Sequence, residues 1–254
     1  MSFTISARAY DRFMGRYSVQ LSSGLADFAG IAAPQRVLDV GCGPGALTDE
    51  LTSRLGANSV SAVDPSEPFV SAAIERHPGV DVRQASAEQL PYPDRTFDAA
   101  LAQLVVHFLK APLTGLREMV RVTRPNGVVA ASVWDHAGGH GPLSSFWKAA
   151  RELDSEVEDE SRLAGTRAGE LATLFHTVGL QDVTEITLSA AVEHPSFDAW
   201  WEPFTLGVGP AGAYTAGLDA RRREQLREHC REMMPSAPFV LAARAWAARG
   251  LTRG

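Results

Sequence analysis

Short apolar runs recur along the first half of the chain and alternate with stretches of helical periodicity. Runs that lack polar alternation are typical of parallel strands buried on both faces of a sheet. They occupy residues 37–40, 60–63, 97–102 and 128–134, and a further strand is expected at residues 80–83. Between the first two runs, Leu47, Leu51 and Leu55 form one helical stripe. Strands that alternate with helices in this way predict an α/β domain with a doubly wound parallel sheet.

The second half of the chain predicts two further strands with a long insert between them. The strands are expected at residues 181–192 and 238–247. The insert, residues 195–236, is too long for a hairpin turn, and its final part has the spacing of an amphipathic helix. Residues 4–29 predict a helix in two pieces.

The first apolar run leads directly into Gly41, Gly43 and Gly45, and a helix follows. Glycine lets a ligand approach the backbone and a helix N-terminus offers unpaired N–H groups, so the arrangement favours an adenine-nucleoside ligand. Asp64 ends the next strand about 20 residues further on, where a ribose-binding carboxylate belongs, although a helix-capping role is the alternative. The loop also fits the relaxed dinucleotide fingerprint, which at this point leaves a nicotinamide-dependent oxidoreductase open.

Three segments of the sequence carry a family resemblance. Residues 37–45, Val-Leu-Asp-Val-Gly-Cys-Gly-Pro-Gly, closely resemble the first motif of the class I S-adenosylmethionine-dependent methyltransferases. Residues 85–98, with Ala-Glu-x-Leu-Pro followed by Phe-Asp, and residues 116–127 resemble later segments of the same family. A nicotinamide dehydrogenase has no reason to carry the 85–98 segment. The chain is therefore identified as a member of this family, from the small-molecule branch similar to ubiquinone and menaquinone methyltransferases.

The resemblance implies the architecture and the reaction. It implies a single domain, residues 1–254, with a Rossmann-like, seven-stranded, mostly parallel sheet whose final strand is antiparallel. The cofactor-binding core would span residues 30–135, and residues 1–29 and 195–236 would form a helical lid and the substrate site. The cofactor would be S-adenosylmethionine, and the acceptor an O, N or C nucleophile of a small molecule. A non-catalytic S-adenosylmethionine-binding protein is an alternative that the motifs do not separate.

The resemblance also implies which residues bind the cofactor. Residues 10–17 are similar to the segment that closes over the cofactor, where Arg16 would pair with the methionine carboxylate. Backbone groups around Ala87 and Glu88 would line the adenine, and Gln103, at a strand end, would face the methionine part. The full expected set is Tyr10, Arg16, Asp39, Gly41, Cys42, Gly43, Asp64, Pro65, Ser86, Ala87, Glu88 and Gln103.

A general base is needed only if the acceptor must lose a proton. His107, just after the fourth strand, is the candidate, with a structural histidine as the alternative, and Asp11 and His136 are weaker candidates. His136 also has Asp135 and His140 as neighbours, which invites a metal site. The intervening Gly138-Gly139 denies the two histidines a helical register and no thiolate completes the set, so we expect no metal.

Composition limits which binding partners and which cellular compartment are expected. A net charge of −6 argues against nucleic-acid binding. No run approaches the roughly 18 apolar residues of a membrane span, and the N-terminus has no uninterrupted apolar stretch typical of a signal peptide. Cys42 and Cys230 lie far apart and suit a reducing compartment. We therefore expect a cytoplasmic monomer or homodimer that acts on a small molecule.

Aromatic residues gather in segments expected at the carboxyl edge of the sheet. They are Trp134, Trp147, Trp200, Trp201 and Phe204. Aromatic side chains give a large contact area with little entropy loss, so they favour an apolar or aromatic acceptor pocket under the lid. The alternative is that they only attach the lid to the core. The acidic residues 154–160 predict a solvated connection, and the arginines at 221–223 a solvated helix face.

Overall fold

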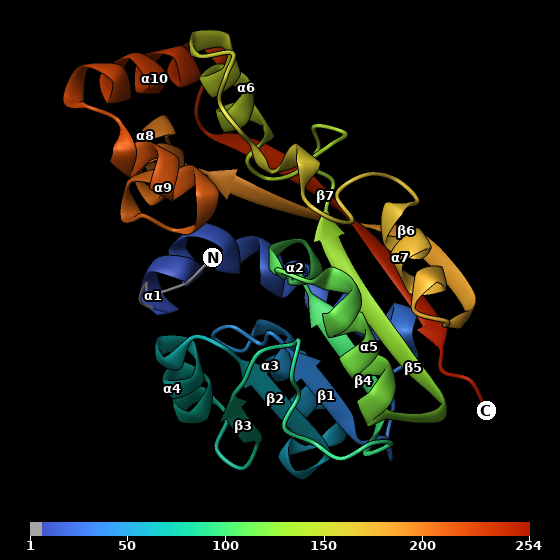
Figure 1. Cartoon of the computed structure of the whole chain (residues 1–254). Coiled ribbons are helices and arrows are strands. Elements are labelled where there is room, and N and C mark those ends of the chain that lie inside the picture. Colours follow the sequence, from blue (N-terminus) through green and yellow to red (C-terminus); the bar gives the residue numbers. More distant parts are fainter. Residues whose placement is uncertain (1–6) are drawn as a thin grey trace.

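The computed structural model describes residues 7–254, and its centre is one seven-stranded sheet with the order β3-β2-β1-β4-β5-β7-β6 (Figure 1). The strands are β1 Val37–Val40, β2 Val60–Asp64, β3 Asp81–Gln84, β4 Phe97–Gln103, β5 Thr123–Trp134, β6 Gln181–His194 and β7 Phe239–Leu251. All neighbouring pairs from β3 to β5 are parallel, and β7 runs antiparallel to both β5 and β6. The predicted mostly parallel sheet with an antiparallel final strand is confirmed.

Helices cover both faces of the sheet because the central strands are apolar on both sides. Leu38 and Val40 of β1 face α5 (Pro112–Val122) and α7 (Glu170–Thr177). Val37 and Val60 face the opposite side, against α2 (Arg16–Ala29) and α3 (Ala46–Leu55). The helix after β2, α4 (Glu67–Arg76), packs through Ala73 on Cys42 and Ala62. The short helices are η2 (Ala57–Ser59), η3 (Val106–Phe108) and η4 (Glu160–Arg162).

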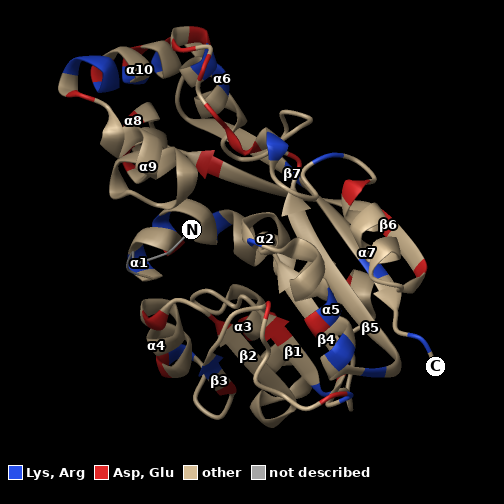
Figure 2. Ribbon diagram, in the orientation of Figure 1, with Lys and Arg blue, Asp and Glu red and all other residues tan. Residues whose placement is uncertain are grey.

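The ends of β6 and β7 extend past the parallel strands and carry a lid (Figure 1). The lid consists of α8 (Phe197–Trp201), η5 (Glu202–Leu206), α9 (Gly209–Gly217) and α10 (Ala220–Met233), together with α6 (Ser144–Leu153). Acidic and basic residues alternate along α10, whereas α8 and α9 are largely uncharged (Figure 2). Over residues 7–254, no helix is both long enough and apolar enough to cross a membrane.

The N-terminal segment lies between the lid and the core (Figure 1). It runs through α1 (Ala7–Tyr10), a π-helical turn η1 (Asp11–Gly15) and α2. The predicted helix covered residues 4–29, of which 4–6 lie outside the described residues. Arg12 binds Glu202 of η5 at 2.7 Å, and Asp11 binds Arg76 of α4. One helical segment therefore contacts both halves of the molecule.

Two local predictions were wrong. The fifth strand was expected from residue 128, but β5 begins at Thr123, which pairs with Phe97 before the register shifts. The Pro125-Asn126-Gly127 sequence, typical of a tight turn, lies inside this stretch, and Asn126 has a φ of 59°. The acidic segment was expected to be solvated to residue 160, but Glu160 is only 3% exposed because it packs under the lid against Trp147.

Gly45 fixes how the loop after β1 enters α3. Its φ is 104°, a conformation that side chains with a Cβ rarely adopt. A Cβ at this position would lie 2.2 Å from Nε2 of His77, a buried side chain. The Gly45 N–H donates to the carbonyl of Cys42 at 3.0 Å, which closes the turn. Only glycine fits here without moving His77 or the turn.

We predict that Gly45→Ala lowers the free energy of unfolding by about 3 kcal/mol. The left-handed backbone costs about 1–2 kcal/mol and the contact with His77 a similar amount. Urea unfolding measures the change, and His77→Ala in the same background should restore the part due to the contact. Gly217→Ala, in α9 with no atom within 4 Å of the added Cβ, is the control and should change stability by less than about 1 kcal/mol. Equal losses in both variants would refute the explanation.

Candidate functional site

The crevice that could hold a ligand lies at the carboxyl ends of β1 and β4. The strand order runs outward from these two strands in opposite directions, so the helices that follow them cover opposite faces. Open α/β sheets bind ligands at such a switch point, because the loops diverge and leave a gap. The glycine loop at residues 41–45 crosses the end of β1 and forms the floor of this gap.

Asp64, at the end of β2, holds the glycine loop in place. Its Oδ2 accepts a hydrogen bond from the Gly43 N–H at 2.9 Å, and its Oδ1 accepts one from the Ser66 N–H at 2.8 Å. Burial raises the pKa of this carboxyl, and the two backbone hydrogen bonds partly offset the shift. An ionised carboxylate has about four lone-pair positions, so each oxygen can still accept a hydrogen bond from a ligand.

Asp39, in the middle of the gap floor, is buried with one oxygen unused. It is 1% exposed, and its Oδ2 accepts a hydrogen bond from Oγ1 of Thr48 on α3 at 2.6 Å. Its Oδ1 has no partner within residues 7–254. Burial raises the pKa of Asp39 to about 7, and the charge of Asp64 adds to the shift while Thr48 opposes it. The site therefore contains a buried acceptor atom without a hydrogen bond.

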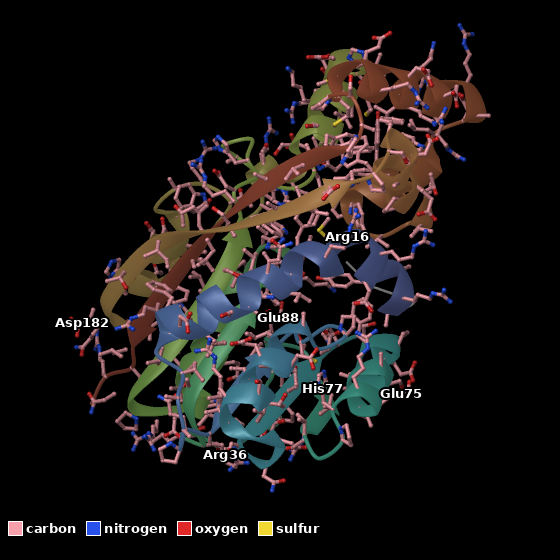
Figure 3. All side chains as sticks on the ribbon, turned by 180° about the vertical axis from the view of Figure 1, so that it is seen from behind. Arg16, Arg36, Glu75, His77, Glu88 and Asp182 are labelled. Carbon is pink, nitrogen blue, oxygen red and sulfur yellow. The ribbon has the colours of Figure 1, made fainter. Side chains whose placement is uncertain are left out.

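Gln103 and Arg16 place further unsatisfied groups in the same gap. The amide nitrogen of Gln103 donates to the carbonyl of Ser18 at 3.0 Å and to Oγ of Ser22 at 3.1 Å. Its Oε1 has no partner in the described chain, and neither does Nε of Arg16. Arg16 starts α2, where the N-terminal segment turns over the core (Figure 3). An unpaired acceptor and an unpaired donor thus line the same cavity.

Two cavities lie on either side of the glycine loop. The Arg16 cavity has a volume of about 310 Å³, and the Asp64 cavity about 340 Å³. They share Tyr10, Gly41, Gly43 and Gln103, so they form one continuous groove. The structure brings the whole expected set to these walls: Tyr10, Arg16, Asp39, Gly41, Cys42, Gly43, Asp64, Pro65, Ser86, Ala87, Glu88 and Gln103.

The carboxylate of Glu88 makes hydrogen bonds within the protein. It accepts hydrogen bonds from Oγ of Ser86, from the Lys110 N–H at 3.0 Å and from the Ala111 N–H at 3.3 Å. Burial raises its pKa, but these hydrogen bonds outweigh it and the net pKa is lowered. Glu88 therefore ties the 86–88 segment to the start of α5. Glu88 also lines the Asp64 cavity, and contact with the adenine through its backbone stays a prediction.

His107 lies outside the groove and lines a third cavity. This His107 cavity has a volume of about 40 Å³ and shares Tyr10, Leu104 and Phe108 with the Asp64 cavity. His107 is 3% exposed, and its ring nitrogens lack hydrogen bonds to any part of the chain that the structure describes. Burial holds its pKa well below the usual value, and the nearby His136 lowers it further. The imidazole is therefore neutral and able to accept a proton.

The residues that invited a metal site make other contacts. Asp135 Oδ2 accepts hydrogen bonds from Arg244 Nε at 2.9 Å, and Oδ2 lies 2.9 Å from Nδ1 of His140. His136 is buried and points away, with Nε2 3.9 Å from Oε1 of Glu160. Residues 7–254 hold no group of three or more His, Cys, Asp or Glu side chains arranged to bind a metal ion.

Comparison with known proteins identifies the family. The family model described as a methyltransferase domain matches residues 38–131, from β1 into β5. Residues 38–131 are therefore a methyltransferase domain, and the predicted class I S-adenosylmethionine-dependent methyltransferase is confirmed. The nicotinamide-dependent oxidoreductase is therefore excluded as a family assignment.

Relatives of this methyltransferase differ in how much of their length they share with it. An uncharacterized methyltransferase of Schizosaccharomyces pombe is 33% identical over 111 residues, which are 39% of this chain and 40% of that protein. A malonyl-(acyl-carrier protein) O-methyltransferase of Erwinia pyrifoliae is 29% identical over 185 residues, 68% of each chain. The solved structure of the YcgJ protein of Bacillus subtilis has a TM-score of 0.60 at 20% identity and covers 92% of this chain and 98% of its own. This structural likeness shows the shared fold.

Several residues of the methyltransferase site were not found from the sequence. Leu104 has a φ of 62°, unusual for leucine, and lines both the Asp64 and the His107 cavities. Strained backbone of this kind is concentrated at functional sites. Thr48, Ser18 and Ser22 orient Asp39 and Gln103. No local pattern signals these features, because each joins separate segments or depends on a single backbone angle.

The aromatic lid residues favour the attachment role over the pocket role. Trp147, Trp200, Trp201 and Phe204 are buried in one cluster with α6, and the rings of Phe146 and Phe204 stack at 4.4 Å. None of these four lines the Arg16, Asp64 or His107 cavity. Trp134 does line the His107 cavity. The cluster is thus the internal core of the lid.

We predict that the buried Asp39 makes the ligand-free protein less stable as the pH rises from 4 to 8. The native pKa is about 7 against 3.8 for the ordinary group, so the native state binds more protons in this interval and stability falls as pH rises. Relative to Asp39→Asn, which does not titrate, wild type should lose about 3–4 kcal/mol across the interval. Urea unfolding at a series of pH values measures this difference. Asp154→Asn, which removes an exposed carboxylate, is the control, and a flat difference for Asp39→Asn would contradict the prediction.

Proposed function

We propose that this protein transfers a methyl group from S-adenosylmethionine to a small-molecule acceptor, with the groove as the cofactor site and the His107 cavity as the acceptor end. The observation that carries the proposal is the set of unpaired polar atoms in the groove. Asp39 Oδ1 and Gln103 Oε1 accept hydrogen bonds, and Arg16 Nε donates one. An amino-acid zwitterion, which presents an ammonium and a carboxylate, satisfies all three.

The rest of the groove fits a nucleoside. Asp64 lines its own cavity with free lone pairs on both oxygens, which suits the two neighbouring hydroxyls of a ribose. Gly43 has a φ of 55°, and an added Cβ would meet no atom within 4 Å, so it would project into the open space where a ligand needs to approach the loop. Ala87 and Phe69 offer apolar surface for a base. The residues present therefore fit the whole cofactor.

The protein aligns the reactants, excludes water from the site and supplies a proton acceptor. When bound, S-adenosylmethionine supplies an activated methyl group on a sulfonium, an inherently good leaving group. Tyr10 lines all three cavities and so lies where the cofactor groove and the His107 cavity meet. A closed site aligns the acceptor with the methyl group and excludes water. His107, neutral and without a hydrogen bond in the described chain, is placed to accept a proton from the acceptor.

The acceptor pocket is formed where the N-terminal segment meets the lid. Phe13 and Met14 line the His107 cavity on one side, and Val208 and Pro210 on the other. These walls suit an apolar acceptor body. The name of the Erwinia pyrifoliae relative, an O-methyltransferase, supports an oxygen nucleophile. Three further points stay predictions. The first is the division into a core at 30–135 and lid segments at 1–29 and 195–236. The others are the similarity to ubiquinone and menaquinone methyltransferases and a cytoplasmic monomer or homodimer.

We predict that the protein binds S-adenosylhomocysteine with a dissociation constant in the micromolar range, about −8 kcal/mol. Asp64→Ala should weaken binding by roughly 1.5–3 kcal/mol, because it removes hydrogen bonds to a charged group and frees the glycine loop. Asp64→Asn should recover only part, since one amide position cannot accept a hydrogen bond from a backbone N–H. Calorimetry measures all three, with Glu75→Ala, exposed on α4, as the control (Figure 3).

Two outcomes would count against the function. Unchanged affinity in a folded Asp64→Ala protein would refute the role of Asp64. Binding of NAD without binding of S-adenosylhomocysteine would refute the cofactor. Turnover of labelled S-adenosylmethionine with a metabolite panel then distinguishes an enzyme from a protein that only binds the cofactor.

A further inference from the structure

Three buried polar side chains meet at the His107 cavity. His107, His136 and Glu160 are 3%, 9% and 3% exposed, and all three line the cavity. The ring centroids of the two histidines are 5.8 Å apart, and His136 Nε2 lies 3.9 Å from Glu160 Oε1. They come from η3, from the residues after β5 and from η4. Only the tertiary fold brings these segments together.

The hydrogen-bonding capacity of this cluster is largely unused. Both nitrogens of His107 and Nε2 of His136 have no hydrogen-bond partner among residues 7–254. Trp147 Nε1 donates to Oε2 of Glu160 at 2.8 Å, which fixes the carboxyl and leaves Oε1 on the side of His136. Buried polar groups are nearly always satisfied, so a cluster left open around a cavity indicates a ligand group that completes it. A volume of about 40 Å³ has room for a small polar group, since about 10–15 Å³ suffices for a water.

Among residues 7–254, no cationic side chain lines the cavity. The residues that line it include neither lysine nor arginine. Arg244 pairs with Asp135, the residue before His136, and its Nη2 lies 2.5 Å from Oδ2 of Asp135. Apart from the three polar side chains, the walls are mainly apolar, with Phe13, Trp134 and Leu143 among them.

Burial keeps the cluster close to neutral. It lowers the pKa of His136 to about 4, partly offset by Asp135, and it lowers that of His107 well below the usual value. It raises the pKa of Glu160 to about 7, partly offset by the hydrogen bond from Trp147. The cavity thus contains neutral imidazoles beside a carboxyl that ionises near neutral pH.

Resting on the methyl transfer proposed above, we propose that His107, His136 and Glu160 receive the acceptor's nucleophile as a neutral hydroxyl group on an apolar body. His107 accepts the proton, and Glu160, held by Trp147, positions His136 so that both histidines contact the hydroxyl. The methyl group is therefore accepted by the oxygen of an alcohol, phenol or enol, and not by a carboxylate or an ammonium.

A charged acceptor group fits this cavity less well than a hydroxyl does. A carboxylate would be buried against Glu160 with no cation to offset its charge, which is costly in a cavity of low polarity. An ammonium could pair with Glu160, but it has no lone pair with which to take a methyl group. A hydroxyl donates one hydrogen bond and accepts others, as the open atoms of two neutral imidazoles require.

The step balances with the groups present. The O–H bond of the acceptor breaks, its electron pair stays on oxygen and the proton moves to a free nitrogen of His107. The oxygen uses that pair to form the bond to the incoming methyl group, while the electrons of the broken C–S bond remain on sulfur. His107 becomes a cation for which ionised Glu160 supplies the compensating charge, and its proton returns to solvent after the product leaves.

The test uses four matched probes and a readout other than turnover. We would titrate 4-ethylphenol, 4-ethylbenzoate, 4-ethylbenzylammonium and 4-ethyltoluene into the full chain saturated with S-adenosylhomocysteine, and follow the ring nitrogens of His107 and His136 by NMR. The phenol should bind about tenfold more tightly than the toluene and shift both histidine signals. The benzoate and the ammonium should bind more weakly than the phenol. Binding of either as tightly as the phenol, or no shift with any probe, would overturn the proposal.

Glu160→Gln isolates the positioning role. The glutamine keeps the size of the side chain and an oxygen for Trp147, but it cannot carry the charge. The preference for the phenol should fall to below about threefold, and the affinity for S-adenosylhomocysteine should stay unchanged. Glu158→Gln, the same change at an exposed position two residues earlier, is the control and should behave as wild type. His136→Asn tests the cluster independently and should have the same effect as Glu160→Gln.

The outcomes distinguish the role of the cluster, the hydroxyl acceptor and the proposed methyl transfer from one another. Wild-type behaviour of Glu160→Gln and His136→Asn would overturn the role of the cluster. A wild-type chain that binds S-adenosylhomocysteine but shows no phenol preference would overturn the hydroxyl acceptor and leave the proposed methyl transfer standing. A chain that fails to bind S-adenosylhomocysteine at all would instead overturn the proposed function.

Discussion

The carboxylate of Asp64 is the contact on which the cofactor groove depends. It joins the loop after β1 to the first residues after β2 by accepting hydrogen bonds from Gly43 and Ser66. These two segments are adjacent because β1 and β2 pair in parallel register. A buried carboxylate is costly unless it is hydrogen-bonded, so the loop and the acid stabilise one another. Gly45, which faces the side chain of His77, fixes the backbone at the other end of the same loop.

The N-terminal segment joins the two ends of the reaction site. Asp11 and Arg12 reach α4 and η5 by ion pairs, and Gln103 anchors the start of α2 through Ser18 and Ser22. Exposed ion pairs contribute little stability, about 0–1 kcal/mol, so their effect here is mainly on position. Because Tyr10 lines all three cavities, a shift of this segment alters the cofactor and the acceptor ends together.

The aromatic residues of the lid are buried inside it, and most of its charged residues lie on the surface of α10. Phe146, Phe204 and the neighbouring tryptophans pack on one another and give the lid a core of its own. Trp147 belongs to that core and donates a hydrogen bond to Glu160, which orients the carboxyl under the lid. The surface of α10 carries both signs of charge, consistent with a solvated helix rather than a phosphate-binding face (Figure 2).

The sequence by itself determined the parallel core and most of the groove. The apolar runs, the glycines at 41, 43 and 45 and the acid at 64 act through neighbours in the chain or through strand ends, which local pattern predicts. Glu160 shows the opposite case: within its acidic run it has every mark of a solvated residue, and it is buried only because α6 and the lid close over it. His107 and His136 likewise approach one another through strand pairing between β4 and β5. Such contacts depend on the packing of distant segments, and no local periodicity encodes which segments will meet.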